Sequence, residues 1–332
     1  MKVVVIYDID LSWNSFEISS ARSSAGELCK ALREEGIETV SEELNSTGLA
    51  QVLDRYNPDD TLLFNLCETM PGIPESESRV IRTIEERGFS YTGNVPGVID
   101  LSYDKQKVKE VLASFDINTP YGEILAPEEA GDWDLFPAIV KPSREHCSLT
   151  ISENSVVYDT LALRNQIAVV NNELKQPALV EDFIDGREFH VSVWCNGRPE
   201  MLPPAEMDFS FFREARDRLC TYDSKFIPGS KHYERIETLL PAPLDDAELQ
   251  SMEDVVIKAW KGLRCRDYAR FDLRLRDQQF YLLDFNPNND ISMDTSFAMA
   301  AEIHGYSYGA VARKIVSMAA NRHPAFVNAL WR

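Results

Sequence analysis

Two patterns of hydrophobic and polar positions divide the chain, and the first occupies roughly residues 1–95. Val3–Ile6 and Thr61–Leu66 are short apolar runs typical of buried strands. Ser20–Glu35 and Glu75–Arg87 carry apolar positions at helical spacing, and a glycine follows each of them. This succession predicts a small parallel α/β domain. Because ligands commonly bind at the carboxyl ends of such strands, we expect binding residues in the loops that follow them.

From Asp104 onward the pattern changes to pairs of strands followed by helices. It predicts two α+β lobes that close on a ligand, so the expected fold class is α/β and α+β. The expected strands are Ala138–Lys141, Ala178–Ile184, Glu188–Trp194, Tyr268–Arg276 and Gln279–Asn286, and the expected helices are Lys105–Phe115, Asp246–Leu263 and about Ser296–Ala320.

Composition narrows the functional classes. The 332 residues include 34 Lys+Arg against 54 Asp+Glu, a net charge of −20, which argues against a general nucleic-acid or anionic-membrane partner. The N-terminal apolar run is a strand too short for a signal peptide, and no stretch approaches the roughly 18 apolar residues that cross a bilayer. The 6 cysteines form no C-x-x-C pair, so we expect reduced thiols in a cytoplasmic protein.

The strongest local signal is a set of polar side chains on the last two predicted strands: Arg270 and Asp272, then Asp284 and Asn286. Residues two apart in a strand share a face, so each pair points one way. If Asp272 faces Asp284, the hairpin is centred on Gln278 and its loop has an odd length. Two carboxylates and an amide oxygen then converge beside a guanidinium, and such oxygen ligands suit Mg²⁺. The alternative is a surface ladder of salt bridges.

Three separated lysines are candidates for binding phosphate. Lys141 leaves the end of an apolar strand, Lys105 begins a helix, and Lys225 lies in a loop. A lysine in such a position can meet phosphate as a point charge, although most lysines are solvated surface groups. Near them, the strand end at 181–184 exposes main-chain groups that could read an adenine edge, and Glu188 could accept hydrogen bonds from ribose hydroxyls.

Together, these features resemble the D-alanine–D-alanine ligase branch of the ATP-grasp superfamily over almost the whole chain. The resemblance implies an N-terminal α/β domain at 1–97, a central lobe at 98–184 and a C-terminal lobe with the metal site at 185–332. The matching motifs, in order, are Tyr91–Asn94, Asp104-Lys105, Pro137–Glu145, Val180–Phe189, Tyr222–Phe226, Tyr268–Leu273 and Gln279–Asn286.

The family's site residues carry over to matching positions here. The resemblance implies two Mg²⁺ ions, with Mn²⁺ as a substitute, held by Asp272, Asp284 and Asn286. It implies catalytic roles for Arg270, which stabilises oxyanion charge, and for Lys225 and Ser148. The residues implied in ATP binding are Lys105, Lys141, Glu181, the main chain of Asp182, Phe183 and Ile184, Glu188, Lys225 and Leu283.

The implied reaction has two steps. A carboxylate attacks the γ-phosphate of ATP to give an acyl phosphate, and an amine then displaces phosphate through a tetrahedral intermediate. Cations must neutralise the approaching anions, and a fixed donor must stabilise the oxyanion. Water must be kept from the acyl phosphate, and the segment Asp208–Gly229 is the candidate lid.

The departures from the family concern substrate rather than ATP. The loop at 146–150 has no glycine, although Ser148 matches a family serine and Cys147 replaces another. We interpret Cys147 as a packed thiol, because this chemistry needs no covalent nucleophile. A bulkier loop should close less tightly or meet a differently shaped acid.

The expected substrate positions are altered as well. Asp290 replaces a glycine near the second-substrate site, where its charge disfavours the carboxylate of D-alanine; the alternative is a turn cap. Thr295 matches a serine that meets the incoming carboxylate. The family's glutamate for the first ammonium group has no exact counterpart, since Ser15 aligns there and Glu17 lies two residues on. Glu68 or Glu75 is expected to take over a substrate contact.

These observations lead to an ATP- and Mg²⁺-dependent ligase that joins a small acid or amino acid to an amino acid, in dipeptide or specialised-metabolite synthesis. The alternatives are a D-alanine–D-alanine ligase of cell-wall synthesis and an ATP-binding regulator without catalysis. The expected partners are therefore small-molecule acids and amines, and the family resemblance suggests a homodimer.

Overall fold

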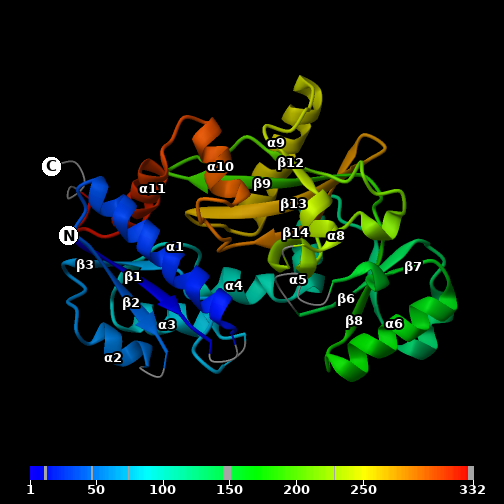
Figure 1. Ribbon diagram of the computed structural model, residues 1–332, viewed down its shortest axis with the longest axis horizontal. Coiled ribbons are helices and arrows are strands. Elements are labelled where there is room, and N and C mark those ends of the chain that lie inside the picture. The colour runs from blue at the N-terminus through cyan, green and yellow to red at the C-terminus, as the bar shows by residue number, and fades with distance from the viewer. Residues whose placement is uncertain (11–12, 46–47, 74, 145–150, 228, 328–332) are drawn as a thin grey trace.

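The computed structural model contains three β-sheets, each built from one part of the chain (Figure 1). It describes residues 1–332 except 11–12, 46–47, 74, 145–150, 228 and 328–332, and the side chains of residues 225 and 226 also lie outside the description. The mixture of one parallel sheet with two antiparallel sheets confirms the predicted fold class.

The first sheet is parallel, with the order β2-β1-β3-β4, and confirms the predicted N-terminal α/β unit. The run Val3–Ile6 forms its centre and is fully buried, because helices cover both faces of a parallel sheet. The elements are β1 (Lys2–Asp8), α1 (Ser15–Glu34), β2 (Thr39–Leu44), α2 (Leu49–Leu53), β3 (Thr61–Asn65), α3 (Glu77–Glu86) and β4 (Ser90–Tyr91).

Helix α1 begins five residues before the predicted start at Ser20. The reason is a capping box: the Asn14 side chain accepts from the Phe16 and Glu17 amides, and Glu17 accepts from the Asn14 amide at 2.7 Å. This reciprocal pairing satisfies amide groups that the first turn leaves open, so the helix extends through a polar stretch.

The second sheet has the order β5-β8-β6-β7 and is antiparallel. Helix α6 packs on it, and the apolar residues of both form a separate small core. The elements of this part are β5 (Gly122–Leu125), η1 (Pro127–Asp132), β6 (Ala138–Pro142), η2 (Glu153–Ser155), β7 (Val156–Val157), α6 (Thr160–Glu173) and β8 (Ala178–Asp182).

The third sheet runs β12-β11-β9-β13-β14, with β10 paired to β9. Strands β8 and β9 flank the Asp185-Gly186 turn but belong to different sheets, so this turn connects the two lobes. The elements are β9 (Arg187–Cys195), β10 (Pro199–Met201), β11 (Ala205–Asp208), η3 (Ala215–Asp217), α7 (Tyr222–Phe226), α8 (Lys231–Arg235), β12 (Glu237–Leu239), α9 (Asp246–Gly262), β13 (Tyr268–Arg276) and β14 (Gln279–Asn286).

The hairpin of β13 and β14 has the predicted pairing of Asp272 with Asp284, but the expected odd-length loop is wrong. The turn consists of two residues, Asp277 and Gln278, with φ values of 51° and 61° that are typical of a type I′ turn. A register shift after Asp272 absorbs the odd residue, since Leu273 pairs with Leu282. Leu283 is therefore the extra residue of a β-bulge.

The expected C-terminal helix is two helices, α10 (Ser296–Ile303) and α11 (Tyr308–Ala320). Gly305 separates them with a φ of 98°, a conformation that glycine adopts most readily. Both helices lie near α1 in Figure 1, and their apolar residues share one core with β1 and β3. Helices α10 and α11 thus complete the N-terminal unit.

Helices α4 (Pro96–Ser102) and α5 (Lys105–Ala113) connect the first sheet to the second. Their buried residues Val98, Val108 and Leu112 belong to the core of the third sheet. The three sheets fall within the ranges 1–97, 98–184 and 185–332, whereas these two helices pack across a range limit. The domain boundaries stay a prediction.

A buried asparagine joins the N-terminal unit to the third sheet. The fully buried Asn94 donates to the Tyr268 carbonyl at 2.9 Å and to the Pro287 carbonyl, and it accepts from the Arg266 amide at 2.6 Å. The main-chain amide of Asn94 donates to the side-chain oxygen of Asn288 at 2.9 Å. Asn94 of the N-terminal unit therefore holds the loop that follows β14 in place.

We expect Asn94→Ala to lower the free energy of unfolding by about 1–3 kcal/mol or more, because it leaves buried main-chain groups without partners. Chemical denaturation measures this change. The exposed Asn57, whose side chain accepts a hydrogen bond from the nearby Asp59 amide, provides the control substitution Asn57→Ala. Equal stability of the two variants would contradict the structural role of Asn94.

Candidate functional site

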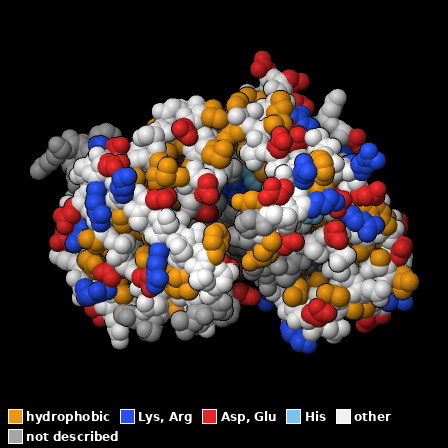
Figure 2. Space-filling model, in the orientation of Figure 1, with side chains coloured by type: hydrophobic (Ala, Val, Ile, Leu, Met, Phe, Trp, Pro, Cys, Tyr) orange, Lys and Arg blue, Asp and Glu red, His pale blue; other side chains and the backbone are white. Residues whose placement is uncertain are grey.

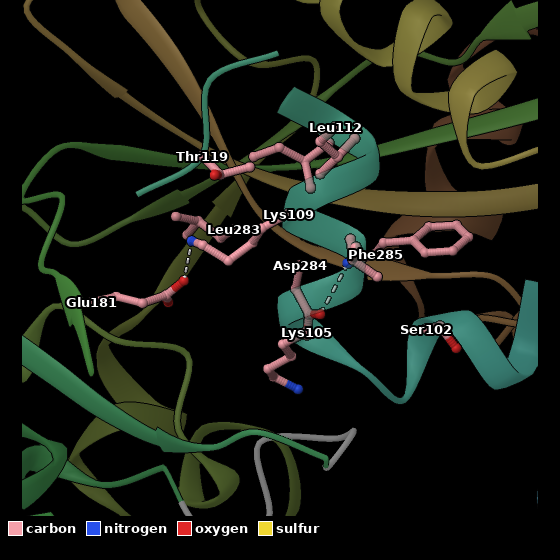
Figure 3. A pocket seen from close by; sticks show the side chains of 11 residues that line it. Ser102, Lys105, Lys109, Leu112, Thr119, Glu181, Leu283, Asp284 and Phe285 are labelled. Atoms are coloured by element: carbon pink, nitrogen blue, oxygen red, sulfur yellow. Dashed lines mark hydrogen bonds and ion pairs between the residues drawn. The ribbon is translucent and has the colours of Figure 1, made fainter. Parts of the chain in front are cut away.

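A pocket lies between α5, the end of β8 and strand β14 (Figure 3). In the space-filling view, the molecule is hollowed near its middle, with acidic side chains on one rim and basic and histidine side chains inside (Figure 2). The pocket-lining residues include four of the sequence-predicted positions, and the full set is Ser102, Lys105, Val108, Lys109, Leu112, Thr119, Glu181, Leu282, Leu283, Asp284 and Phe285.

Glu181 is a buried carboxylate between two ammonium groups. Its side chain lies 2.5 Å from the Lys109 Nζ and 2.7 Å from the Lys141 Nζ. Burial alone would raise the pKa of Glu181, but the two lysines outweigh it and lower the pKa to about 2. Burial would lower the pKa of Lys141, but the charges of Glu181 and Asp284 outweigh burial, so the pKa lies above its ordinary value. Glu181 and Lys141 are therefore both ionised at neutral pH.

Strand pairing sets this arrangement. Ile139 faces Glu181 in the β6–β8 ladder, so Lys141, two residues along, is a diagonal neighbour of Glu181 on the same face. On the other side, Gly122 pairs with Glu181. A Cβ at Gly122 would lie 2.7 Å from the Glu181 Cγ, so glycine leaves the space that this side chain occupies.

Lys105 is brought to the same pocket by the main chain. Its amide donates to the Ser143 carbonyl at 3.2 Å, which holds the start of α5 against the end of β6. The close-up shows the side chains of Lys105 and Asp284 on the same side of α5 (Figure 3). Two of the three predicted phosphate-binding lysines thus lie near one another, whereas the Lys225 side chain and Ser148 lie outside the described residues.

The β13–β14 hairpin gathers the four polar residues predicted on it. Arg270 pairs with both carboxylate oxygens of Asp272, at 2.7 and 2.9 Å, and the Asn286 amide donates to Asp272 at 3.2 Å. Burial would lower the pKa of Arg270, but the carboxylates of Asp272 and Asp284 raise it. Arg270 is thus a permanent cation held beside the predicted metal ligands.

The donor set fits a hard divalent cation. Asp272, Asp284 and Asn286 supply carboxylate and amide oxygens, the ligands that Mg²⁺ prefers. The bulge at Leu283 turns this residue and Asp284 toward the pocket, while Leu282 and Phe285 on either side belong to the core. Leu283 therefore lines the pocket, next to Asp284, as an apolar surface.

Glu188 and Arg274 form a buried ion pair beside the pocket. The shortest distance is 2.7 Å, and the two residues face each other across β9 and β13. Burial would raise the pKa of Glu188, but Arg274 lowers it to about 2. Glu188 is thus ionised, as its predicted contact with ribose hydroxyls requires.

The main chain at 182–184 is partly used within the protein. The amides of Asp182 and Phe183 donate to the carbonyls of Tyr121 and Pro137, at 2.9 and 3.0 Å. The carbonyl of Ile184 accepts from Arg274 at 2.7 Å. The predicted contact with adenine at this strand end would therefore have to use the other main-chain groups of the segment.

Four acidic residues lie where β1 and β3 end and where the loop after β14 meets them. Asp8 accepts from the amides of Glu68 and Thr69, at 3.0 and 3.1 Å. Burial, followed by the charges of Asp8 and Asp290, raises the pKa of Glu68 to about 7. Burial also raises the pKa of Glu77 to about 8, against the hydrogen bond from Asn288.

The predicted substrate residues have definite local roles. Asp290 accepts from the Ser292 amide at 2.8 Å, which is the turn cap given as the alternative reading, and its charge also acts on Glu68. Thr295 is the N-cap of α10, and Glu17 completes the capping box of α1. Of the four, Glu68 and Asp290 are electrostatic neighbours.

Sequence reasoning missed three residues of the site. Lys109 lies one helical turn after Lys105 on α5, so the spacing of four was a usable signal. Arg274 continues the alternation of Arg270 and Asp272 along β13. Asp8 is an acidic residue that ends a buried strand, a position at which ligand-binding groups are common.

Two α+β lobes enclose a pocket with lysine side chains, next to a hairpin that carries oxygen ligands for a metal ion. This combination is typical of the ATP-grasp class of proteins. Residues 122–317 match the family model for the C-terminus of D-ala D-ala ligase. An uncharacterized protein of Sinorhizobium fredii, y4sG, is 30% identical over 90% of this chain and 88% of its own length. The D-alanine–D-alanine ligase of Aquifex aeolicus is 24% identical over 96% and 99%.

A solved structure agrees with this likeness. D-alanine–D-alanine ligase from Bacillus anthracis, complexed with ATP, superimposes with a TM-score of 0.72 at 19% identity, covering 96% of this chain and 97% of that chain. The chain belongs to the D-alanine–D-alanine ligase family of ATP-grasp proteins, which confirms the resemblance found in the sequence. Among the described residues, no helix is long and apolar enough to cross a membrane.

We expect Gly122→Ala to weaken ATP binding by about 10-fold or more, because the new methyl group displaces Glu181 from its two lysines. Calorimetric titration with ATP and Mg²⁺ measures the affinity. Gly131→Ala is the matched control, since a Cβ there meets no atom within 4 Å. If both variants bind ATP equally well, the position of Glu181 is not important for the nucleotide.

We expect the stability of the protein to fall as the pH rises from about 4.5 to 8, in part because of Glu77. Its pKa is about 8 in the fold against an ordinary 4.5, so protonation stabilises the fold and this contribution is lost on ionisation. Glu77→Gln should flatten the decline in unfolding free energy between pH 5 and 9. The exposed Glu86→Gln on the same helix is the control, and an unchanged pH dependence in Glu77→Gln contradicts the assignment.

Proposed function

We propose that the protein is an ATP-dependent carboxylate–amine ligase whose acid and amine are not both D-alanine. The observation that carries the proposal is the hairpin set of Arg270, Asp272, Asp284 and Asn286, which faces the lysines of the pocket. Membership of the D-alanine–D-alanine ligase family supports an ADP-forming reaction. The proposed products are a dipeptide or an amino-acid-modified specialised metabolite.

Each proposed step has a residue suited to it. Lys105 and Lys141 would neutralise phosphate charge as the acid attacks, and Arg270 would stabilise the oxyanion when the amine attacks. Asp272, Asp284 and Asn286 would hold the divalent cation, which draws electron density from the phosphoryl group. The bulge residue Leu283 would pack against adenine. Lys225, Ser148 and a closing segment at 208–229 remain proposed participants.

The choice against D-alanine rests on the acidic residues at the substrate side. Asp290 would place negative charge where the family's second substrate has its carboxylate, and its charge, like that of Asp8, also contributes to the raised pKa of Glu68. Glu68, Glu17 and Thr295 stay candidates for substrate contacts. The cytoplasmic location and the homodimer also stay proposals, and sedimentation analysis tests the latter.

A panel of acids and amines tests the function directly. The purified protein is given ATP, Mg²⁺ and pairs of substrates, and ADP, phosphate and the amide product are measured. We expect ADP and product in equal amounts for a pair other than D-alanine with itself. Turnover with D-alanine alone would support the cell-wall ligase instead, and ATP binding without turnover on every pair would indicate a regulator.

We expect Asp284→Ala to abolish ligation and weaken the binding of Mg²⁺–ATP, because a metal ligand is lost. Arg270→Lys keeps a positive charge beside Asp272 but loses the forked guanidinium. It should spare nucleotide binding and lower kcat about 10²–10³-fold, as removal of an oxyanion donor does. Calorimetry with kinetics separates the two effects. An equal loss of ATP affinity in both variants would refute this division of roles.

A further inference from the structure

Arg274 is a buried cation that the proposed chemistry does not use. The residue is about 1% exposed and lies in the middle of the third sheet. The Nε donates to the Glu188 Oε2 at 2.8 Å, and the Nη1 donates to the Ile184 carbonyl at 2.7 Å. The Nη2 donates to the Arg218 carbonyl, and the guanidinium carbon lies 4.7 Å from the centre of the Phe183 ring.

These interactions occupy most of the hydrogen-bond donors of Arg274 with groups of the protein itself. Four of its N–H groups are directed at Glu188, Ile184 and Arg218, of the five that a guanidinium has. Its contacts with Glu188 use only Oε2, and the other oxygen lies 3.8 Å from the His190 Nε2. Arg274 is therefore placed to fix its neighbours through Oε2 of Glu188, while Oε1 of Glu188 faces His190, which also helps to lower the pKa of Glu188.

We propose that Arg274 is a positioning residue for the nucleoside half of ATP, holding Glu188 and the 183–184 segment in the arrangement that receives the ribose. This inference rests on the proposed function for the presence of ATP. It goes beyond that function because it assigns part of the affinity for the ribose hydroxyls to Arg274, which acts through its hydrogen bond to Glu188.

The chemistry of burial explains why an arginine occupies this position. Glu188 is about 6% exposed, and a buried carboxylate without a counter-charge is strongly disfavoured. A lysine would supply the charge but could not reach a carboxylate and two separate carbonyls at once. Arg274 keeps Glu188 ionised, so that it accepts hydrogen bonds from hydroxyl groups.

Strand pairing and a close main-chain contact also fix the position of Arg274. Arg274 faces Glu188 directly across β13 and β9, and Leu275 faces Arg187. Gly186 lies so close to β13 that a Cβ would meet the Leu275 carbonyl at 2.0 Å. The connection between the two lobes is thus pressed against the strand that carries Arg274, and its conformation is fixed there.

The test measures the affinities of the full-length protein for ATP and for 2′,3′-dideoxy-ATP, with Mg²⁺, by calorimetry. The variants are Arg274→Met and Arg274→Lys, with the double variant Glu188→Gln/Arg274→Met to cover the case in which an unpaired Glu188 prevents folding. The control is Arg187→Met, which removes a guanidinium that pairs with buried Glu206 at 2.7 Å on the other face of the same sheet.

We expect the wild type to bind ATP at least about 10-fold more tightly than the dideoxy nucleotide, and Arg274→Met to lose about 10- to 100-fold in ATP affinity. The ratio between the two nucleotides should fall toward one in Arg274→Met and in the double variant. Arg274→Lys should keep part of the ratio, and the control should keep all of it.

An unchanged ratio in folded Arg274→Met, or a wild type that binds both nucleotides equally, would overturn the positioning role and leave the ligase proposal standing. A fall in the ratio in Arg187→Met as large as that in Arg274→Met would also overturn it, because the effect would then be general. A wild type that binds neither nucleotide contradicts both proposals. Binding with the expected ratio but no ligation on any substrate pair contradicts only the ligase.

Discussion

The site depends on the register of strand β13. Its pairing with β14 places Asp272 opposite Asp284 and Arg270 opposite Asn286, and its pairing with β9 places Arg274 opposite Glu188. A shift of β13 by one residue would turn Arg270, Asp272 and Arg274 into the apolar core and expose Phe271. The two-residue turn and the bulge at Leu283 are what reconcile this register with the chain length between the strands.

The buried carboxylates near β13 are each paired with lysine or arginine side chains. Glu181 lies between two lysines, Asp272 accepts both arms of Arg270, and Glu188 is held by Arg274. Each carboxylate is desolvated and compensated, so the site can remain ionised without a ligand. The net charge of −20 therefore belongs to the chain as a whole, while Lys105 and Lys109 line the pocket itself. Where β1 and β3 end, the acidity continues inward through Asp8 and Glu68, and burial together with the charges of Asp8 and Asp290 raises the pKa of Glu68.

Much of the fold could be predicted from hydrophobic periodicity, because strands such as Val3–Ile6 and the hairpin Tyr268–Asn286 are set by local pattern. The start of α1 and the break at Gly305 could not, since a capping box and a single glycine override the apolar spacing. The bulge at Leu283 escaped for a similar reason, as alternation assumes unbroken pairing. Lys109 and Arg274 were missed because their importance lies in a buried partner from a distant segment, Glu181 or Glu188, which no local pattern reveals.

The central claim is that ATP and its metal lie between the Glu181 lysines and the β13–β14 hairpin. A crystal structure with a non-hydrolysable ATP analogue and Mn²⁺ tests it most directly, since anomalous scattering locates the metal. The account predicts manganese peaks bound by Asp272, Asp284 and Asn286, with phosphate groups at Lys105 and Lys141 and the ribose at Glu188. A nucleotide bound elsewhere, or manganese away from these three side chains, would contradict it.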